Sequence, residues 1–175
     1  MKATGKIVYI RLLSTDDVSE DYVNWMNDPE VTQFLESKWQ SHTQKSTIEY
    51  IDSFNRTQNN FLFGIFLLSD NTHIGNVKIG NINYVHSHAD IGMAIGKKDS
   101  WTKGVGSESL MLIEKIAREY LNLNKIFGGI YAINHGSFTM TQKCGWREVG
   151  RFEKHVFHKG EYMDVILVEK LIGKL

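Results

Sequence analysis

The sequence has little of what marks several protein classes. One cysteine, Cys144, rules out an internal disulfide and makes a cysteine-based zinc site a poor expectation. The longest apolar stretch, residues 61–68, is interrupted by Gly64 and is too short to span a membrane. Residues 1–9 carry Lys2 and Lys6 and no apolar core, so no secretion signal is expected. We therefore expect a cytoplasmic protein.

The chain also lacks net charge. Lys plus Arg and Asp plus Glu are both 20 in 175 residues, so no overall field favours nucleic acid or anionic lipid as a partner. There is one proline, no linker-like segment and no repeat. With 42% hydrophobic residues, this composition predicts a single domain over residues 1–175.

Hydrophobic spacing predicts alternating helices and strands. A strand over residues 6–13 is followed by a helix N-cap around Ser14, and Asp28 and Pro29 are suited to start a second helix. Two further helices are expected over residues 44–56 and after Gly106. Strands are expected at residues 61–68, 73–85, 89–96, 125–133, 145–157 and 161–171, with a short helix at 134–143. The order predicts a mixed α/β domain with a central antiparallel meander.

The junction between the strand ending at Gly96 and the long helix carries the clearest chemical signal. Gly104 and Gly106 stand where the helix begins, and the free N–H groups of a helix start favour an anion such as phosphate. Ser107 and Glu108 replace the Lys-Ser/Thr of a P-loop, and Ser109 replaces the third glycine of a dinucleotide fold. Both nucleotide motifs are therefore disfavoured. A glycine turn without a ligand is the alternative.

This loop resembles motif A of the GCN5-related N-acetyltransferases (GNAT), whose pattern is Gln/Arg-x-x-Gly-x-Gly/Ala. Trp101 departs from the general pattern but matches the branch of ribosomal-protein N-terminal (RimJ/RimL-type) acetyltransferases, as do Lys103, Gly104 and Glu108. Three other segments are similar to the same branch in the same order: residues 27–31, residues 134–146 and residues 160–165. The resemblance covers roughly residues 7–170.

The resemblance implies the GNAT fold, a bent and mainly antiparallel sheet of six or seven strands with helices on both faces. It also implies direct acetyl transfer from acetyl-CoA to a primary amine, without a metal. Acetyl-CoA is expected to enter a gap between two strands, around Met93 and Ile130. The implied coenzyme contacts are Ala94, Ile95, Gly96, Lys103, Gly104, Val105, Gly106, Ser107 and Asn134. For Asn134 a helix N-cap is an equally good role.

Candidate groups for proton transfer lie before the glycine loop, in residues 86–90, and after it, in residues 137–141. Asp90 stands where relatives often carry an acid, and strand alternation puts His88 on its face, toward the substrate. Asp90 is expected either to act as a base through water or to pair with a nearby lysine. Metal binding by His86 and His88 is the weaker alternative. Thr141 replaces the tyrosine that many relatives use as the acid, so Ser137 or water is the remaining candidate.

The acceptor is less defined by the sequence. Trp39 is the better pocket candidate and Trp25 the better core candidate, while Cys144 has no activating neighbour and is expected to be structural. The resemblance implies an amino-sugar nucleotide or a protein N-terminus as acceptor. A polyamine ranks lower because the sequence has no dense carboxylate cluster. A non-catalytic acyl-CoA sensor and a homodimer through the closing hairpin stay open.

Overall fold

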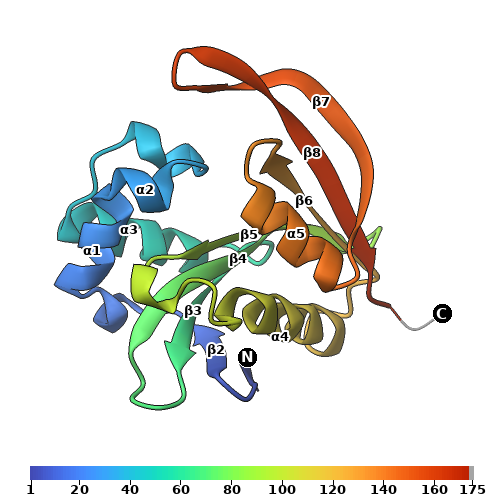
Figure 1. Cartoon of the computed structure of the whole chain (residues 1–175). Coiled ribbons are helices and arrows are strands. Elements are labelled where there is room, and N and C mark those ends of the chain that lie inside the picture. Colours follow the sequence, from blue (N-terminus) through green and yellow to red (C-terminus); the bar gives the residue numbers. More distant parts are fainter. Residues whose placement is uncertain (174–175) are drawn as a thin grey trace.

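A computed structural model describes residues 1–173 and contains one eight-stranded sheet (Figure 1). The sheet order is β1-β2-β3-β4-β5-β6-β8-β7, and every pair is antiparallel except β5 with β6. The strands are β1 (Lys2–Thr4), β2 (Val8–Leu12), β3 (Phe61–Leu67), β4 (His73–Asn83), β5 (His88–Ile95), β6 (Lys125–Tyr131), β7 (Arg147–His158) and β8 (Glu161–Leu171). The fold class is confirmed, with one short strand, β1, more than expected.

The helices follow the predicted order, but the first helix begins later than predicted. The α-helices are α1 (Glu20–Asn27), α2 (Pro29–Thr32), α3 (Gln44–Asn55), α4 (Val105–Glu119) and α5 (His135–Lys143), and short 3-10 turns are η1 (Thr15–Asp17), η2 (Glu36–Trp39) and η3 (Lys98–Ser100). Asp28 caps α2 and Pro29 is its first residue, as predicted. The N-cap prediction at Ser14 was wrong for α1, because Ser14 caps only η1 and Ser19 caps α1. The Asp17 carboxylate completes a capping box that closes the turn early.

Helices cover both faces of the sheet, as expected. Strand residues on one face, such as Val8 and Phe63, share a buried core with α4. Their neighbours on the opposite face, such as Tyr9 and Leu62, pack against α1 and α3. Trp25 belongs to this second core and is 8% exposed, which confirms its structural role.

Strands β5 and β6 separate after a short contact. Only residues 88–90 of β5 pair with residues 125–127 of β6, although β5 continues to Ile95 and β6 to Tyr131. On its opposite edge β6 pairs with β8 along its whole length, from Lys125 to Tyr131. The diverging ends form a V-shaped gap in the sheet, and the β7–β8 hairpin arches across it toward α2 (Figure 1).

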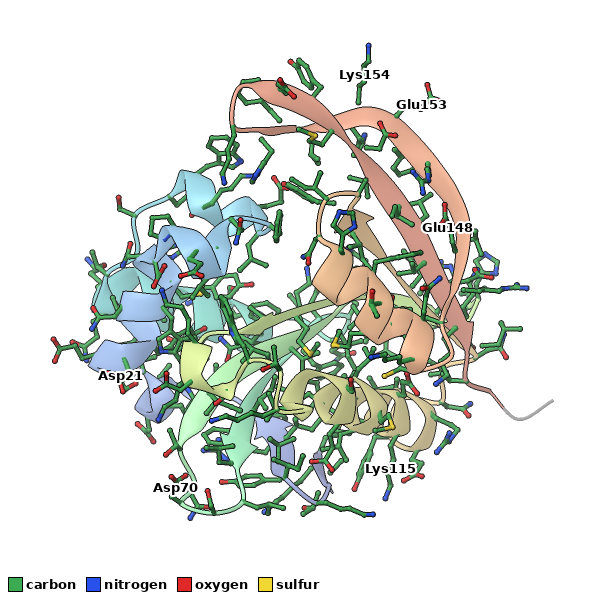
Figure 2. All side chains as sticks on the ribbon, in the orientation of Figure 1. Asp21, Asp70, Lys115, Glu148, Glu153 and Lys154 are labelled. Atoms are coloured by element: carbon green, nitrogen blue, oxygen red, sulfur yellow. The ribbon has the colours of Figure 1, made fainter. Side chains whose placement is uncertain are left out.

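The outer surface is charged and mixed in sign. Figure 2 shows charged side chains pointing outward from α1 (Asp21), the turn after β3 (Asp70), α4 (Lys115) and β7 (Glu148, Glu153 and Lys154). Within residues 1–173, no helix is long and apolar enough to cross a membrane.

Candidate functional site

The loop between β5 and α4 presents free backbone N–H groups. Gly104 is the N-cap of α4, and no side chain caps the helix there. The first helical hydrogen bond joins the N–H of Glu108 to the Gly104 carbonyl, at 3.0 Å. The preceding turn is anchored by the Trp101 indole, whose Nε1 donates to the Ile95 carbonyl at 2.8 Å. The amides at the start of α4 therefore have no side-chain cap, which is the arrangement that an anion site at a helix start requires.

The backbone conformation favours glycine at Gly104, and a side chain at Gly106 would have to displace the Met140 thioether. Gly104 has φ +82°, a left-handed conformation that side chains with a Cβ rarely adopt. A Cβ on Gly106 would come within 2.9 Å of the Met140 Sδ, so α5 packs directly on the start of α4. Lys103 lies exposed beside them, and Val105 is buried in the core.

Glu108 has a structural task that its place in the motif did not reveal. Its carboxylate accepts backbone N–H bonds from Lys6, Ile7 and Val8 at 2.7, 2.7 and 2.8 Å. Partial burial alone would raise the pKa of Glu108, but these three bonds outweigh it and hold the pKa below its ordinary value. Glu108 therefore fixes the first turn of α4 to the chain entering β2.

The V-shaped gap is open where the predicted coenzyme residues lie. A Cβ on Gly92 would have no neighbour within 4 Å, although Gly92 is in the middle of a central strand. Residues 91–95 pair with β4 but not with β6, so their other backbone edge faces the gap. The edge at Ala94 and Ile95, with Gly96 just beyond, is thus placed to offer main-chain groups. Met93 and Ile130 belong to the apolar core on the α4 face.

Helix α5 borders the gap and begins at Asn134. The Asn134 side-chain oxygen accepts the Ser137 N–H at 3.1 Å, which confirms the N-cap role. Within residues 1–173 its amide nitrogen has no hydrogen bond, so a second role remains open. Thr141 is buried, and its hydroxyl donates to the Phe138 carbonyl at 2.8 Å. Thr141 is therefore not available as a proton donor.

Asp90 lies at the closed end of the gap, on the face opposite α4. Its Oδ1 accepts the Asn81 amide at 2.7 Å, and its Oδ2 is 3.8 Å from the Lys78 Nζ. Asn81 reaches this position because a bulge in β4 gives it φ +49°. His88 is on the same face, as alternation predicted, and its ring lies 5.6 Å from the Phe127 ring. The bulge at Asn81 was not visible in the sequence.

An open cleft lies between the N-terminal helices and the tip of the β7–β8 hairpin. Its volume is about 430 Å³. The residues that line it are Met26, Asn27, Pro29, Thr32, Gln33, Lys38, Trp39, Gln40, Ser41, His158 and Lys159. Trp39 is 62% exposed within it, which agrees with its predicted place in a pocket.

A hydrogen-bonded group of side chains joins this cleft to β6. The Tyr131 hydroxyl donates to Glu36 Oε1 at 2.7 Å and accepts from the Lys38 Nζ at 3.3 Å. Phe34 stacks on His158, with ring centroids 5.5 Å apart. Burial and then the ammonium groups of Lys38 and Lys159 lower the pKa of His158. Sequence analysis missed Glu36, Lys38, Tyr131 and His158, because the group is assembled from three distant segments.

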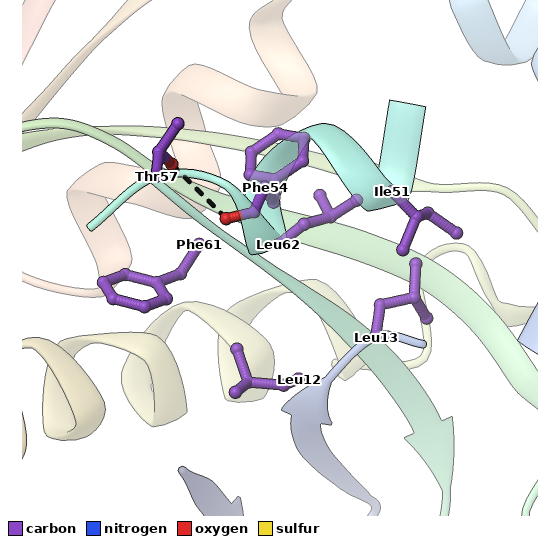
Figure 3. Close-up of a pocket in the computed structure, with 7 residues that line it drawn as sticks. All are labelled: Leu12, Leu13, Ile51, Phe54, Thr57, Phe61 and Leu62. Atoms are coloured by element: carbon purple, nitrogen blue, oxygen red, sulfur yellow. Dashed lines mark hydrogen bonds between the residues drawn. The ribbon is translucent and has the colours of Figure 1, made fainter. Parts of the chain in front are cut away.

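Two further features are structural. The Cys144 thiol is half-buried, lies 3.8 Å from the Ser107 carbonyl, and has a pKa raised by burial, as expected for an unreactive cysteine. A second pocket, of about 200 Å³, lies between α3, β2 and β3 and is lined by Thr57 and six apolar residues (Figure 3). The Thr57 hydroxyl is bonded to the Phe54 carbonyl at 3.4 Å. None of the described residues that line this pocket is titratable.

The described residues form no group of three or more His, Cys, Asp or Glu that could hold a metal ion.

Residues 8–147 match the family model of the acetyltransferase (GNAT) domain. The chain belongs to the GNAT family of acetyltransferases. This GNAT enzyme is similar to the probable N-acetyltransferase YjcK of Bacillus subtilis, with 28% identity over 91% of each chain.

Solved structures share the fold of this GNAT enzyme. Spermidine N-acetyltransferase from Vibrio cholerae, in complex with CoA and spermine, has a TM-score of 0.83 and 21% identity over 94% of this chain and 95% of that one. Ribosomal-protein-S5-alanine acetyltransferase from Vibrio fischeri also has a TM-score of 0.83, with 17% identity over 98% and 96% of the two chains. These neighbours confirm the fold, and the second belongs to the branch that the sequence motifs resemble.

Proposed function

We propose that this GNAT enzyme transfers an acetyl group directly from acetyl-CoA to the primary amine of an amino-sugar nucleotide. The observation that carries the proposal is the V-shaped gap, which opens beside an uncapped helix start. Backbone N–H groups and the positive end of the α4 dipole suit a pyrophosphate, while the free edge of β5 suits an extended amide-containing arm. We also propose that residues 1–175 act as one domain, in the cytoplasm.

The coenzyme contacts follow from this placement. The N–H groups at Gly104, Val105, Gly106 and Ser107 would bind the pyrophosphate, with Lys103 adding an exposed positive charge. Ala94, Ile95 and Gly96 would pair with the pantetheine arm through main-chain groups, and the free amide of Asn134 would reach it from the other wall. These contacts tolerate side-chain change at residues 94–96, except at Gly96, where a Cβ would overlap the Trp25 ring.

Asp90 is our candidate for the base. A primary ammonium has a pKa of about 10.4 and must lose a proton before it attacks the thioester carbonyl. Asp90 lies at the closed end of the gap and is held there by Asn81 and Lys78. We propose that it takes the proton through a water molecule, with His88 on the same face toward the acceptor. Ser137, at the start of α5, or water would protonate the departing thiolate.

The charge of the cleft favours an anionic acceptor. Among the described residues that line it, Lys38 and Lys159 are positive and none carries a carboxylate. Glu36, which lies beside the cleft, is bonded to the Tyr131 hydroxyl. A diphosphate would be attracted to these lysines, whereas a polyamine would be repelled. Trp39 offers an exposed ring on which a base or sugar could stack. A protein N-terminus is the second candidate.

The proposal is tested by calorimetric titration with acetyl-CoA, followed by thiol release over amino-sugar nucleotides, N-terminal peptides and polyamines. We expect binding, and release only with an amino-sugar nucleotide. Lys159→Ala should raise the KM for that acceptor by about tenfold, since one charge-assisted phosphate contact is lost. Lys45→Ala, a change of an 85% exposed lysine on α3, is the matched control and should not change KM. Thiol release with N-terminal peptides alone would contradict an amino-sugar nucleotide as the acceptor. Binding of acetyl-CoA without thiol release for any acceptor would contradict the catalytic role.

A further inference from the structure

Lys38 is turned toward the interior of the cleft. Its Nζ donates to the Gln33 carbonyl and to the Tyr131 hydroxyl, each at 3.3 Å. The same nitrogen lies 4.9 Å from the Trp39 ring centroid and 4.8 Å from the Tyr131 ring centroid. By comparison, the side chain of Lys45, on the following helix α3, is 85% exposed. The Lys38 ammonium is thus held by the Trp39 and Tyr131 rings, by the Tyr131 hydroxyl and by a backbone carbonyl.

Tyr131 connects Lys38 to the Glu36 carboxylate by hydrogen bonds. Tyr131 donates to Glu36 Oε1 at 2.7 Å, so a proton leaving Lys38 has a hydrogen-bonded path of one phenol to an acceptor. Burial and the Glu36 carboxylate both raise the pKa of Tyr131, which keeps the phenol protonated and able to pass a proton on. Glu36 is exposed and therefore exchanges that proton with water.

Tyr131 also places this group at the gap. It is the last residue of β6, beyond the residues that pair with β5. Its neighbour Ile130 belongs to the core on the α4 face, so alternation directs Tyr131 to the opposite face. Asp90 and the open space over Gly92 lie on that same face. Lys38 therefore lies against the wall of the gap in which we propose that acetyl-CoA binds.

We propose that Lys38 is an internal acceptor, acetylated in the same molecule by the acetyl-CoA bound in the gap. This inference rests on the proposed function. The Lys38 ammonium gives a proton through Tyr131 to Glu36, and the free amine attacks the thioester carbonyl. A C–N bond forms as the C–S bond breaks, and CoA leaves as a thiolate that takes up the second proton lost by the attacking nitrogen. The products are N-acetyl-Lys38, CoA and one proton released to solvent.

Acetylation of Lys38 changes the cleft. It removes one of the two lysine charges that line the wall proposed to attract the acceptor. The modified enzyme should bind an anionic acceptor more weakly while its coenzyme loop is unaltered. Self-acetylation would then lower turnover when acetyl-CoA is abundant and acceptor is scarce.

The experiment is incubation of the full chain with acetyl-CoA alone, with acetylated lysines followed by mass spectrometry of peptides. We expect Lys38 to be acetylated at least tenfold faster than Lys45, although chemical acetylation favours the more exposed amine. The fraction modified per unit time should not depend on enzyme concentration. Equal rates at the two lysines, or a rate that rises with enzyme concentration, would overturn the proposal.

Variants separate this inference from the proposed function. Gly104→Val should reduce the Lys38 rate to that of Lys45, because coenzyme no longer binds. Tyr131→Phe should slow Lys38 acetylation at least tenfold and leave Lys45 unchanged. Glu36→Gln should lower the limiting rate without changing the acetyl-CoA concentration at half-maximal rate, whereas a purely structural defect would change both. If acetyl-CoA binds by calorimetry and Lys38 is unmodified, the inference fails alone; if acetyl-CoA does not bind, the proposed function fails.

Discussion

The two walls of the active region are built in different ways. The proposed coenzyme side uses mainly one continuous segment, residues 94–107, whose main-chain amides at the start of α4 are supplemented by Lys103 and by Asn134 of α5. The proposed acceptor side combines η2, the end of β6 and the hairpin tip, and presents the side chains of Lys38, Tyr131 and His158. A local main-chain site is recorded in a short sequence motif. A side-chain site assembled from distant segments is visible only after folding.

The largest effect we expect comes from breaking the coenzyme side. Gly104→Val should weaken acetyl-CoA binding by at least about 100-fold, which corresponds to about 2.7 kcal/mol. Its φ of +82° is unfavourable for valine, and the branched side chain blocks close approach of a phosphate to the helix start. Calorimetric titration measures the loss.

A matched variant shows whether strain alone explains that loss. Gly160 at the hairpin tip also has a positive φ, +91°, and a Cβ there would meet nothing within 4 Å. Gly160→Val should carry a similar conformational cost and leave acetyl-CoA affinity unchanged. Equal loss in both variants would mean that the coenzyme does not bind at the start of α4.

The second effect concerns Asp90, the proposed base at the closed end of the gap. Asp90→Ala should lower kcat by about 100-fold, the range of general-base catalysis, and keep the affinity for acetyl-CoA. Asn81→Ala should lower kcat by a smaller factor, about tenfold, because it only frees the carboxylate that Asn81 holds at 2.7 Å. Unchanged turnover in Asp90→Ala would remove Asp90 from the mechanism.

The smallest effect is on stability rather than on catalysis. Glu108→Gln should lower the free energy of unfolding by about 1–3 kcal/mol, since three N–H bonds to a carboxylate are weakened. Glu119→Gln, on the exposed end of α4, is the control and should cost less than about 0.5 kcal/mol. Denaturant titration of each variant gives the difference.

The pH dependence of this difference has a definite sign. The pKa of Glu108 is lowered in the folded chain, so its contribution is present above the unfolded value of about 4.3 and is lost as pH falls through the folded value. The difference between wild type and Glu108→Gln should be constant from about pH 6 to pH 8 and shrink in more acidic solution. A difference that grows on acidification would contradict the role assigned to Glu108.

The sequence predicted most of the fold, and it predicted those parts of the candidate site that lie in one short segment. The Asp28-Pro29 helix start, the amphipathic α4 and the N-cap at Asn134 were recognised because each depends on residues close together in the chain. The start of α1 was misplaced because Asp17 closes a short turn with Ser14 before the helix begins. Glu36 and Tyr131 carry no local motif, since 95 residues separate the partners of their hydrogen bond.

Strand β6 is attached more firmly to the outside of the sheet than to its centre. It shares three residue pairs with β5 and seven with β8. Strands β6 and β8 still share one apolar core with the rest of the sheet, through Ile126, Ile130 and Ile166. Because the pairing with β5 ends at Phe127, the main chain of β6 from Gly128 to Tyr131 has a partner strand on one edge and an open edge on the other. The separation of the two strands at Tyr131 is therefore set by side chains and by any molecule bound along that edge, rather than by a backbone ladder.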